Sequence, residues 1–372
     1  MSELYLGLMS GTSLDGVDGV LADLSTTPLT VLSHASAPLS APLTQELLAL
    51  NSPGGVNELH RGALAANALV HIYAQVVAHL LEKSGVAKAA VNAIGAHGQT
   101  VRHRPQFFDG TGYSLQLNNP ALLAELTGIT TVADFRSRDV AAGGQGAPLV
   151  PAFHQSVFGR PGYTVATLNI GGISNLTVLG PAMADDVLGF DCGPGNALMD
   201  AWCQRHLGAP FDADGAWAAA GQVSVELLAS LLAEPYFAVA APKSTGRDLF
   251  NAEWLAAKLE NFQSLEPVDV QATLTELTAS SCTASLNRYG MQSQKLIVCG
   301  GGAFNAELMR RLQAHLPGVR VNSSQAHGLP PLQVEATAFA WLARQALLRQ
   351  TGSLKKVTGA KGARILGAIY PA

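Results

Sequence analysis

Two apolar runs in this chain break at glycine and hydroxyl residues and then resume, and they dominate its hydrophobic pattern. The first occupies residues 4–18 and the second residues 167–178. Each pattern predicts a strand, a turn without large side chains and a returning strand. Glycine in such a turn lets backbone N–H groups and hydroxyls approach a phosphate closely. We therefore expect two hairpins, one near the start of each half, that grip one anion from both sides.

Between these hairpins, apolar runs of strand length alternate with stretches of helical period. The predicted strands are residues 29–33, 91–96, 113–117 and 129–133, and the predicted helices are residues 44–50, 56–83 and one opened by Asn119 and Pro120. Residues 97–103 are expected in a polar loop. This alternation predicts an α/β domain with a mostly parallel or mixed sheet, in which ligands bind at the carboxyl ends of the strands.

The second half repeats the alternation after a flexible, glycine-rich segment, residues 140–148. Its predicted helices are residues 197–206, 223–233, 252–261, 270–289 and 334–348. We expect a boundary near residues 150–164, with an N-terminal domain of residues 1–160 and a C-terminal domain of residues 161–372. The final run, residues 365–369, is the segment that can return to the first domain.

A third glycine cluster, residues 300–305, follows a predicted strand of residues 295–299 and opens a predicted helix of residues 307–316. Glycine at the carboxyl end of a strand leaves room for a flat ligand. The helix N-terminus behind it favours polar or negative groups. This combination predicts a nucleotide site.

The composition limits the partners of the chain. Its 372 residues are 48% hydrophobic and 13% charged, which suits two compact cores. The 23 Lys and Arg residues against 27 Asp and Glu leave a net charge of −4 and no basic surface, so we expect no nucleic-acid partner. The apolar stretch of residues 63–81 carries polar side chains at near-helical spacing, which is typical of an amphipathic helix, and we expect no membrane partner.

Two further features favour the cytoplasm. The amino terminus runs directly into a predicted strand, without a basic segment or cleavage site. The four cysteines, at positions 192, 203, 282 and 299, lack the spacing of a zinc or redox site and are expected to be buried thiols in a reducing compartment.

Asp191 is the candidate general base. It follows an apolar strand and precedes a Gly-Pro-Gly turn at residues 193–195, where a carboxylate can point into a cleft. The alternative is that Asp191 only accepts N–H groups of the turn before the next helix. The paired phosphate hairpins favour the catalytic interpretation.

Glu335 lies in the first turn of an otherwise apolar helix. The helix dipole alone explains a carboxylate there, and a functional role is the alternative. The chain contains no GxxxxGK[ST], GxSxG or HExxH motif, and residues 300–305 offer only a degenerate dinucleotide pattern. A P-loop and a dinucleotide fold are therefore disfavoured.

Together, these features resemble the anhydro-N-acetylmuramic acid kinase family of the sugar kinase, heat-shock chaperone and actin superfamily. The resemblance covers nearly the whole chain and depends on the order of its motifs. These are residues 9–18, 97–100, 134–136, 143–148, 169–175, 191–196 and 242–247. It implies two related ribonuclease H-like α/β domains around a central ATP-binding cleft, which is the actin-like ATPase fold.

The resemblance also implies an ATP site with magnesium. The residues it assigns to ATP are Gly11, Thr12, Ser13, Leu14, Asp15, Gly16, Val17 and Asp18 of the first hairpin, Gly171, Gly172 and Asn175 of the second, and Gly300, Gly301, Gly302 and Asn305 near adenosine. The wider superfamily commonly carries an aspartate where this chain has Leu8. Glu335 and Asp15 are therefore assigned to the metal, with Asp18 as the alternative.

The reaction implied by the resemblance opens the anhydro bridge of 1,6-anhydro-N-acetylmuramic acid with water, while oxygen 6 takes the γ-phosphoryl group of ATP. The products are N-acetylmuramic acid 6-phosphate and ADP, in peptidoglycan recycling. Because the phosphoryl group caps the departing oxygen, one carboxylate suffices. We expect Asp191 to take a proton from the water that attacks carbon 1.

The remaining assignments concern the sugar. Its lactyl carboxylate requires a cation, for which Arg136, Arg102 and Arg247 are the candidates. The residues expected at the sugar hydroxyls or acetamido group are His97, Gln99, Thr100 and Asp134, with Arg136 beside them. The resemblance also implies a homodimer.

Two alternatives remain open at this stage. The first is another sugar kinase of the same superfamily, in which Asp191 deprotonates an open hydroxyl. The second is a binding module in which ATP hydrolysis only drives domain closure.

Overall fold

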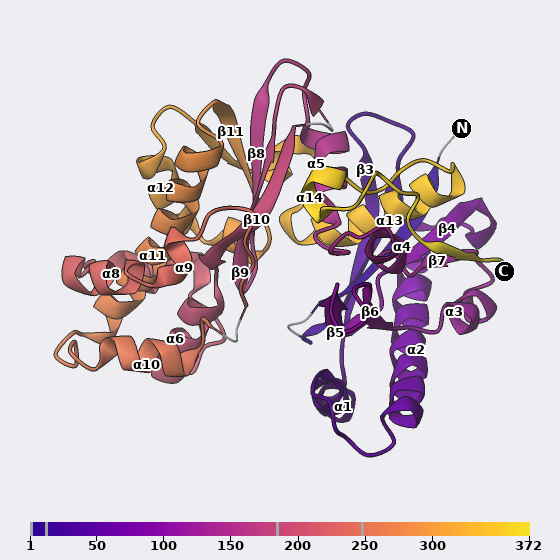
Figure 1. Cartoon of the computed structure of the whole chain (residues 1–372), viewed down its shortest axis with the longest axis horizontal. Coiled ribbons are helices and arrows are strands. Elements are labelled where there is room, and N and C mark those ends of the chain that lie inside the picture. The colour runs from indigo at the N-terminus through magenta and orange to yellow at the C-terminus, as the bar shows by residue number, and fades with distance from the viewer. Residues whose placement is uncertain (1–2, 12–13, 184–185, 247–248) are drawn as a thin grey trace. The chain divides into compact units, whose positions relative to one another are not determined.

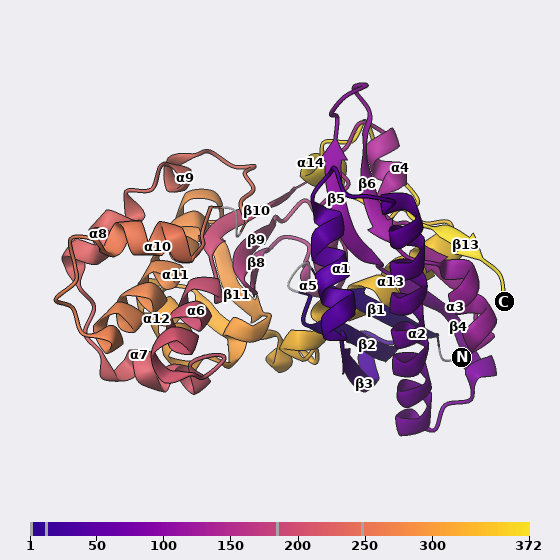
Figure 2. The same cartoon turned by 90° about the horizontal axis from the view of Figure 1, so that it is seen from below.

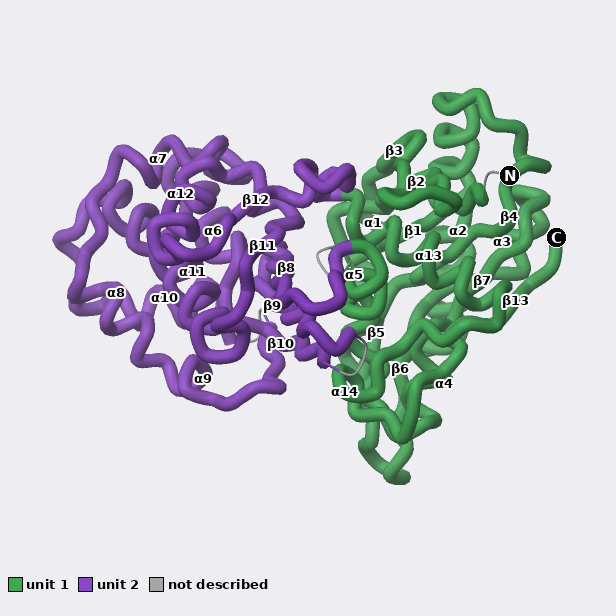
Figure 3. Tube along the Cα trace, turned by 90° about the horizontal axis from the view of Figure 1, so that it is seen from above, with its two compact units in different colours: residues 1–157, 333–372 green, residues 158–332 purple. Residues whose placement is uncertain are grey.

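The computed structural model describes residues 3–11, 14–183, 186–246 and 249–372. The chain forms two compact units, coloured separately in Figure 3. The first contains residues 1–157 and 333–372, and the second contains residues 158–332. Each unit has its own β-sheet and its own hydrophobic core.

The first unit is built on a six-stranded sheet in the order β13-β7-β4-β1-β2-β3. The strands are β1 (Leu4–Ser10), β2 (Gly16–Asp23), β3 (Thr30–Pro38), β4 (Val91–Ala96), β7 (Thr131–Ala133) and β13 (Ala368–Tyr370). Strands β1, β2 and β3 form an antiparallel meander, whereas β4 runs parallel to β1 and β7 parallel to β4. The first phosphate hairpin of the sequence analysis is therefore the β1–β2 pair.

The helices of this unit are mostly short. They are α1 (Ala41–Asn51), α2 (Glu58–Ser84), η1 (Lys88–Ala90), α3 (Pro120–Thr127), α4 (Ser137–Ala141), α5 (Val150–Phe158, whose last residue falls in the second unit), α13 (Val334–Leu347) and α14 (Lys355–Thr358), with η6 (Pro331–Gln333) at the junction. Two of these helices, α2 and α13, provide the two hydrophobic layers of the sheet.

Helix α2, the long purple helix of Figure 1, is the core helix of the first unit. Its length and apolar content would also suit a membrane span. However, Leu69, Tyr73, Val76 and Leu80 are buried in the same cluster as residues of β1 and β2, and the polar side chains at positions 71, 75 and 79 are exposed. Burial of one face is the behaviour expected of an amphipathic helix on a sheet.

Helix α13 packs unusually closely on the opposite side of β1 and β4 (Figure 2). A Cβ atom at Gly7 would collide with the carbonyl oxygen of Ala336, and one at Gly95 with that of Phe339. Glycine on the strands and alanine on the helix thus bring the two backbones together. From the sequence, residues 333–372 are expected in the C-terminal domain, apart from a final run that can return to the first domain. In the structure, all of residues 333–372 belong to the first unit.

The second unit has a five-stranded sheet in the order β10-β9-β8-β11-β12. Its strands are β8 (Thr164–Ile170), β9 (Ile173–Leu179), β10 (Val187–Pro194), β11 (Ser293–Cys299) and β12 (Arg320–Ser323). Its helices are α6 (Ala197–Leu207), η3 (Ala213–Gly215), α7 (Ala216–Ala220), α8 (Val225–Leu232), α9 (Pro235–Ala238), α10 (Ala252–Leu259), α11 (Pro267–Tyr289), η4 (Gly301–Phe304), α12 (Ala306–His315) and η5 (Ser324–His327). The buried helix α11 packs on β9 and β10.

The two sheets share one topology. In each, the first strand of the unit pairs antiparallel with the second and parallel with the fourth, so that the five corresponding strands lie in the order 3-2-1-4-5. The repetition confirms the expected fold class of two related ribonuclease H-like α/β domains. The duplicated hairpins of the sequence are the first two strands of each repeat.

The predicted polar loop at residues 97–103 is wrong in part. Residues Gln99–Pro105 form strand β5, which pairs with β6 (Gly112–Leu117) as an antiparallel hairpin. The run is rich in histidine and arginine and is only partly buried, so its strand character comes from pairing with β6 and not from an apolar pattern.

Candidate active site

The second hairpin turns at Gly171 and Gly172, between β8 and β9. The carbonyl oxygens of this turn accept backbone N–H groups of Gly195, Asn196 and Ala197, at 2.7–3.2 Å. A Cβ atom at Gly171 would meet nothing closer than 3.8 Å. The turn is therefore fastened to the start of α6 on one side and left open on the other.

The triglycine segment, Gly300 to Gly302, reaches the same turn. Gly300 has a φ of 78°, and a Cβ atom at Gly302 would collide with the side chain of Ile170 at the end of β8. The side-chain amide of Asn196 donates to the carbonyl of Ile170 at 3.2 Å and lies against both Gly301 and Gly302. Two segments that the sequence assigned to nucleotide binding thus come together in the second unit, around Asn196 of the motif that carries Asp191.

Asn305, which is expected near adenosine, is the N-cap residue of α12. Its side-chain oxygen accepts the N–H of Leu308 at 2.9 Å and caps α12. Such a cap satisfies one of the free N–H groups at a helix start.

Asp191 lies in a row of polar residues across the sheet of the second unit. It pairs with Asn175 of β9, which in turn pairs with Asn169 of β8. Directly opposed residues on neighbouring strands place their side chains on the same face. The strand register shifts between Asp191 and Gly193, so the catalytic candidate stands at a β-bulge, a feature that often re-aims a side chain beside a functional site.

One carboxylate oxygen of Asp191 is held by the segment that follows α9. Oδ2 accepts the hydroxyl of Ser244 at 3.0 Å and the backbone N–H of Thr245 at 3.1 Å. Among the described residues, Oδ1 has no hydrogen-bond partner. Burial raises the pKa of the Asp191 carboxyl, and these two hydrogen bonds oppose the rise.

The backbone of Asp191 is anchored as well. Its N–H donates to the carbonyl of Lys243 at 3.0 Å, and its carbonyl accepts the hydroxyl of Tyr236 at 2.8 Å. Lys243 in turn places its ammonium 4.3 Å from the centre of the Tyr236 ring and donates to the Tyr236 carbonyl. Residues 242–247 are recognisable in the sequence as a family motif, but no local pattern indicates the contact of Ser244 with Asp191 or that of Tyr236 with the Asp191 carbonyl.

The first hairpin is described except at Thr12 and Ser13, which lie outside the described residues. Leu14 N–H donates to the Gly11 carbonyl at 3.2 Å, and the Leu14 and Val17 side chains are buried in apolar clusters. Leu14 and Val17 can therefore offer only backbone groups to a phosphate. A Cβ atom at Gly16 would press against the Ala37 carbonyl, so this glycine allows β2 and β3 to pair closely.

In the first unit, the charges of Asp18 and Arg136 both act on the carboxyl group of Glu335. Burial and the charge of Asp18 raise the pKa of Glu335, while the Arg136 guanidinium opposes the rise. Asp15 is exposed, and Asp18 lies 3.4 Å from the imidazole of His34. Among the residues that the structure describes, no three His, Cys, Asp or Glu side chains are grouped to hold a metal ion.

His97 and Arg136 stand behind the first hairpin. The Nδ1 atom of His97 lies 3.1 Å from the carbonyl oxygen of Ser10, and its Nε2 atom lies 2.9 Å from Nη2 of Arg136. Arg136 also donates from Nη1 to the Gly146 carbonyl at 2.8 Å. Both ring nitrogens of His97, a predicted sugar ligand, thus have protein partners, and the ring is 4% exposed.

The other predicted sugar ligands also have partners. Gln99 donates to the Gly11 carbonyl at 3.1 Å, whereas its buried Oε1 atom has no partner among the described residues. Thr100 donates its hydroxyl to Gln116 at 2.7 Å. Asp134 is exposed and accepts the Ser137 hydroxyl at 2.6 Å. Gln99 is therefore the member of this set with an unused buried acceptor.

The glycine-rich segment before α5 is pinned by Asp139. Its buried carboxylate accepts the Gly146 N–H and the Thr358 hydroxyl, both at 2.8 Å. A Cβ atom at Gly144 would collide with that carboxylate. Asp139 thus fixes Gly146 through its N–H, and the carbonyl of the same residue accepts the hydrogen bond from Arg136.

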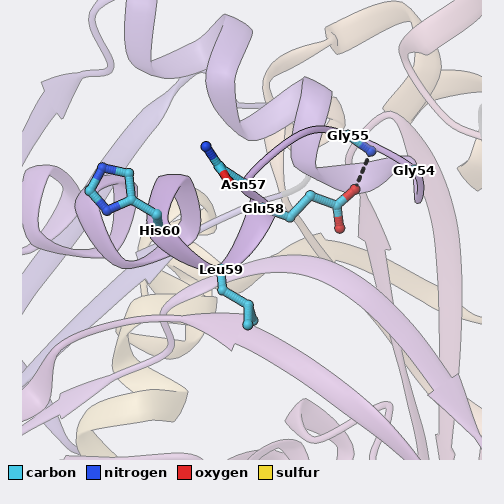
Figure 4. Close-up of a pocket in the computed structure, with 6 residues that line it drawn as sticks. All are labelled: Gly54, Gly55, Asn57, Glu58, Leu59 and His60. Carbon is cyan, nitrogen blue, oxygen red and sulfur yellow. Dashed lines mark hydrogen bonds between the residues drawn. The ribbon is translucent and has the colours of Figure 1, made fainter.

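The remaining arginine candidates differ. Arg102 donates to Glu58 at 2.6 Å and to the Ser52 carbonyl at 3.0 Å. Glu58 lies beside an open hollow lined by residues 54, 55 and 57–60, none of them a predicted ligand, and Figure 4 shows its bond to Gly55. Arg247 lies outside the described residues. The charge of Arg102 is compensated by Glu58, whereas the hydrogen-bond partners of Arg136 among the described residues are neutral.

All four cysteines are free and buried, as predicted from their apolar surroundings. Cys192, next to Asp191, is fully buried, and Cys282 donates to the hydroxyl of Ser174 at 3.3 Å. Burial raises the pKa of the Cys192 thiol.

Comparison with known proteins extends over the whole chain. A family model described as anhydro-N-acetylmuramic acid kinase matches residues 3–372. Proteins with that name from Albidiferax ferrireducens and Variovorax paradoxus are 72% and 65% identical, over 100% of this chain and 100% and 99% of theirs. One from Bordetella pertussis is 55% identical over 99% of this chain and 96% of its own.

Solved structures resemble the chain more distantly. The activator of the 2-hydroxyisocaproyl-CoA dehydratase from Clostridium difficile gives a TM-score of 0.49 at 13% identity, covering 93% of this chain and 96% of its own. A ROK family glucokinase from Streptomyces griseus gives a TM-score of 0.42 at 15% identity, covering 92% and 99%.

Proposed function

Since the chain belongs to the anhydro-N-acetylmuramic acid kinase family, and is accordingly an ATP-dependent sugar kinase, we propose that it acts on 1,6-anhydro-N-acetylmuramic acid in peptidoglycan recycling. Water attacks carbon 1 and breaks its bond to oxygen 6. Oxygen 6 takes the γ-phosphoryl group of ATP, and the proton of the water leaves to a base. The products are N-acetylmuramic acid 6-phosphate and ADP.

The observation that carries this proposal is the environment of Asp191. Two hydrogen bonds hold Oδ2, so that Oδ1 is the oxygen left to accept the proton of the attacking water. Burial makes the carboxylate more basic than usual, which suits a general base. The proposal needs no second carboxylic acid, because the phosphoryl group neutralises the departing oxygen.

For the phosphates, we assign the turn at Gly171 and Gly172, and near adenosine the adjoining Gly301 and Gly302. Their support is the convergence of three glycine-bearing segments around Asn196. Open backbone with exposed N–H groups is a common phosphate cradle. The first hairpin, with Gly11 and the neighbouring Thr12 and Ser13, keeps the ATP assignment that the family resemblance implies.

For the lactyl carboxylate, we assign Arg136. Burial lowers its pKa only to about 10, so the guanidinium remains charged at neutral pH. Its Nε atom is buried and without a partner within the described residues. A charged fork with an unused donor fits a bidentate carboxylate. Arg102 fits less well, because it already pairs with Glu58.

Magnesium is expected with ATP, and Glu335 is the first residue that would hold it. Of the two aspartates assigned from the sequence, we now place Asp18 before Asp15, because the charge of Asp18 acts on Glu335 and Asp15 is exposed. The negative charges of Glu335 and Asp18 repel each other, and the charge of Asp18 contributes to the raised pKa of Glu335. A bound cation would relieve this repulsion. Magnesium usually keeps several waters and takes only one or two protein carboxylates beside the phosphates. When bound, it neutralises charge on the transferring phosphoryl group.

We also propose a cytoplasmic homodimer. The buried free cysteines suit a reducing compartment. The dimer follows only from the family resemblance, and light scattering on the purified protein tests it directly.

The decisive experiment follows the oxygen of isotopically labelled water. With ATP and the anhydro sugar, we expect the label at carbon 1 of the product and none in the transferred phosphate. The Asp191→Asn variant should bind ATP normally and lose turnover by roughly a hundredfold to ten-thousandfold. Label in phosphate without labelled sugar would exclude the proposal.

A second assay separates the alternatives. The open sugar, N-acetylmuramic acid, is offered in place of its anhydro form. Preference for the open sugar would indicate an ordinary sugar kinase in which Asp191 deprotonates a hydroxyl. ATP hydrolysis that is insensitive to either sugar would indicate a nucleotide-gated binding module.

A further inference from the structure

The hydrogen-bond partner of Arg136 is a histidine. Arginine side chains more commonly pair with a carboxylate. Its Nη2 atom is 2.9 Å from Nε2 of His97, and its Nη1 atom is 2.8 Å from the Gly146 carbonyl. Neither partner carries a negative charge, because an imidazole is neutral or, when protonated, positive, and a backbone carbonyl is neutral. These two neutral partners therefore hold the guanidinium in place, while Glu335, whose charge acts on Arg136, makes no hydrogen bond to it among the described residues.

The contacts of His97 select one form of its ring. A carbonyl oxygen only accepts hydrogen bonds, so the contact with Ser10 requires a proton on Nδ1. A guanidinium nitrogen only donates, so the contact with Arg136 requires a lone pair on Nε2. The neutral Nδ1–H tautomer satisfies both contacts, and an imidazolium would set N–H against N–H.

The surroundings of His97 favour the same form. Burial and the nearby Arg136 lower the pKa of His97 to about 3. The ring packs against Phe339 of α13, with centroids 4.7 Å apart. The histidine is thus neutral and immobilised at neutral pH.

His97 also links Arg136 to the end of β1. Ser10, the last residue of that strand, gives its carbonyl to His97 and is itself held through its hydroxyl, 3.1 Å from that of Tyr73 and 3.2 Å from the Gly98 carbonyl. The chain of contacts from the first hairpin to the arginine therefore passes through one imidazole.

We propose that His97 is a positioning residue that fixes the Arg136 guanidinium through Nε2 while leaving its charge for the substrate carboxylate. The inference rests on the proposed function, because the anion is the lactyl group of the sugar. Arg102 shows the contrasting arrangement, in which a glutamate both orients and neutralises the guanidinium.

Two variants separate the two ends of the ring. In His97→Asn, the shorter amide can still donate toward Ser10 but cannot reach Arg136. In His97→Gln, the longer amide can offer an oxygen to Arg136. His97→Asn should raise KM for the anhydro-muramic sugar at least tenfold, the usual scale for a lost charge-assisted hydrogen bond, with KM for ATP changing less than about twofold. His97→Gln should restore most of that loss.

A sugar without the lactyl carboxylate tests whether His97 acts through the interaction of Arg136 with that carboxylate. The inhibition constant of 1,6-anhydro-N-acetylglucosamine, which lacks the lactyl group, should be the same in wild type, His97→Asn and Arg136→Ala. His60→Gln serves as the control, because His60 is exposed on α2 and should leave every constant unchanged. Thermal unfolding and ATP binding show whether each variant is folded.

Equal losses for both sugars in a folded His97→Asn protein, or no loss for either, would overturn the positioning role. If the wild-type protein does not phosphorylate the anhydro-muramic sugar at all, the proposed function itself fails. The two failures are therefore distinguished by the wild-type assay.

Discussion

The Ser244 hydroxyl donates a hydrogen bond of 3.0 Å to Oδ2 of Asp191, across 53 residues of sequence. Hydrogen bonds to the charged form of a carboxyl lower its pKa. Here that bond opposes the effect of burial, which raises the pKa of Asp191. Ser244 therefore keeps the proposed base ionised toward lower pH.

Replacing Ser244 by alanine should move the acidic limb of the kcat/KM profile to higher pH, because Asp191 then protonates more easily. The pH profile from about 4 to 8 measures this shift around the usual range of a raised carboxyl. Thr245→Ala is the control, since Thr245 contributes its backbone N–H, which the variant keeps. An unchanged acidic limb in Ser244→Ala would argue against Asp191 as the titrating group.

Stability should depend on pH through His97. Its pKa in the folded protein, about 3, lies below the ordinary value of 6.5, so its contribution to stability is present above pH 6.5 and is lost as pH falls. Between pH 7 and pH 5 the wild type should lose about 2 kcal/mol more than His97→Gln does. Chemical unfolding at both pH values measures the difference. The exposed His60→Gln variant should behave as wild type does, and equal losses in His97→Gln and wild type would contradict the assignment.

The close approach of α13 to the first sheet can be tested with one methyl group. Gly7→Ala places its Cβ against the Ala336 carbonyl and should lower the free energy of unfolding by about 1–3 kcal/mol. Gly62→Ala, within α2, has its nearest neighbour at 3.6 Å and should instead raise it by roughly 0.5–1 kcal/mol, because alanine favours the helix. Thermal and denaturant unfolding compare the two. A tolerated Gly7→Ala would mean that the helix can move away from the strand.

Metal dependence should pass through Glu335. Removal of divalent cations with EDTA should abolish turnover, and added magnesium should restore it. Glu335→Gln should need more magnesium for half-maximal activity, because one carboxylate of the pair with Asp18 is lost. The exposed Glu253→Gln variant is the control and should titrate as wild type does. Identical magnesium curves for Glu335→Gln and wild type would remove Glu335 from the metal assignment.

Much of the fold is readable along the chain, because local patterns specify local structure. The strand predicted at residues 91–96 is β4 as observed, and the two hairpins, α6 and most of α11 lie close to their predicted positions. Strand β5 is not predicted from the sequence, because its charged side chains interrupt the alternation of apolar and polar residues. It forms a strand by pairing with β6. Helix α13 was predicted as a helix, but an apolar, alanine-rich sequence does not say which sheet it covers.

The residues around the candidate site divide in the same way. Glycine clusters and a carboxylate beside a Gly-Pro-Gly turn are contiguous in sequence, so the chemistry that they permit follows from chain order. Which oxygen of Asp191 is held, and which tautomer His97 adopts, depend on partners 53 and 39 residues away. Tertiary packing alone decides these contacts, because hydrogen bonds between distant residues require a geometry that no local pattern encodes.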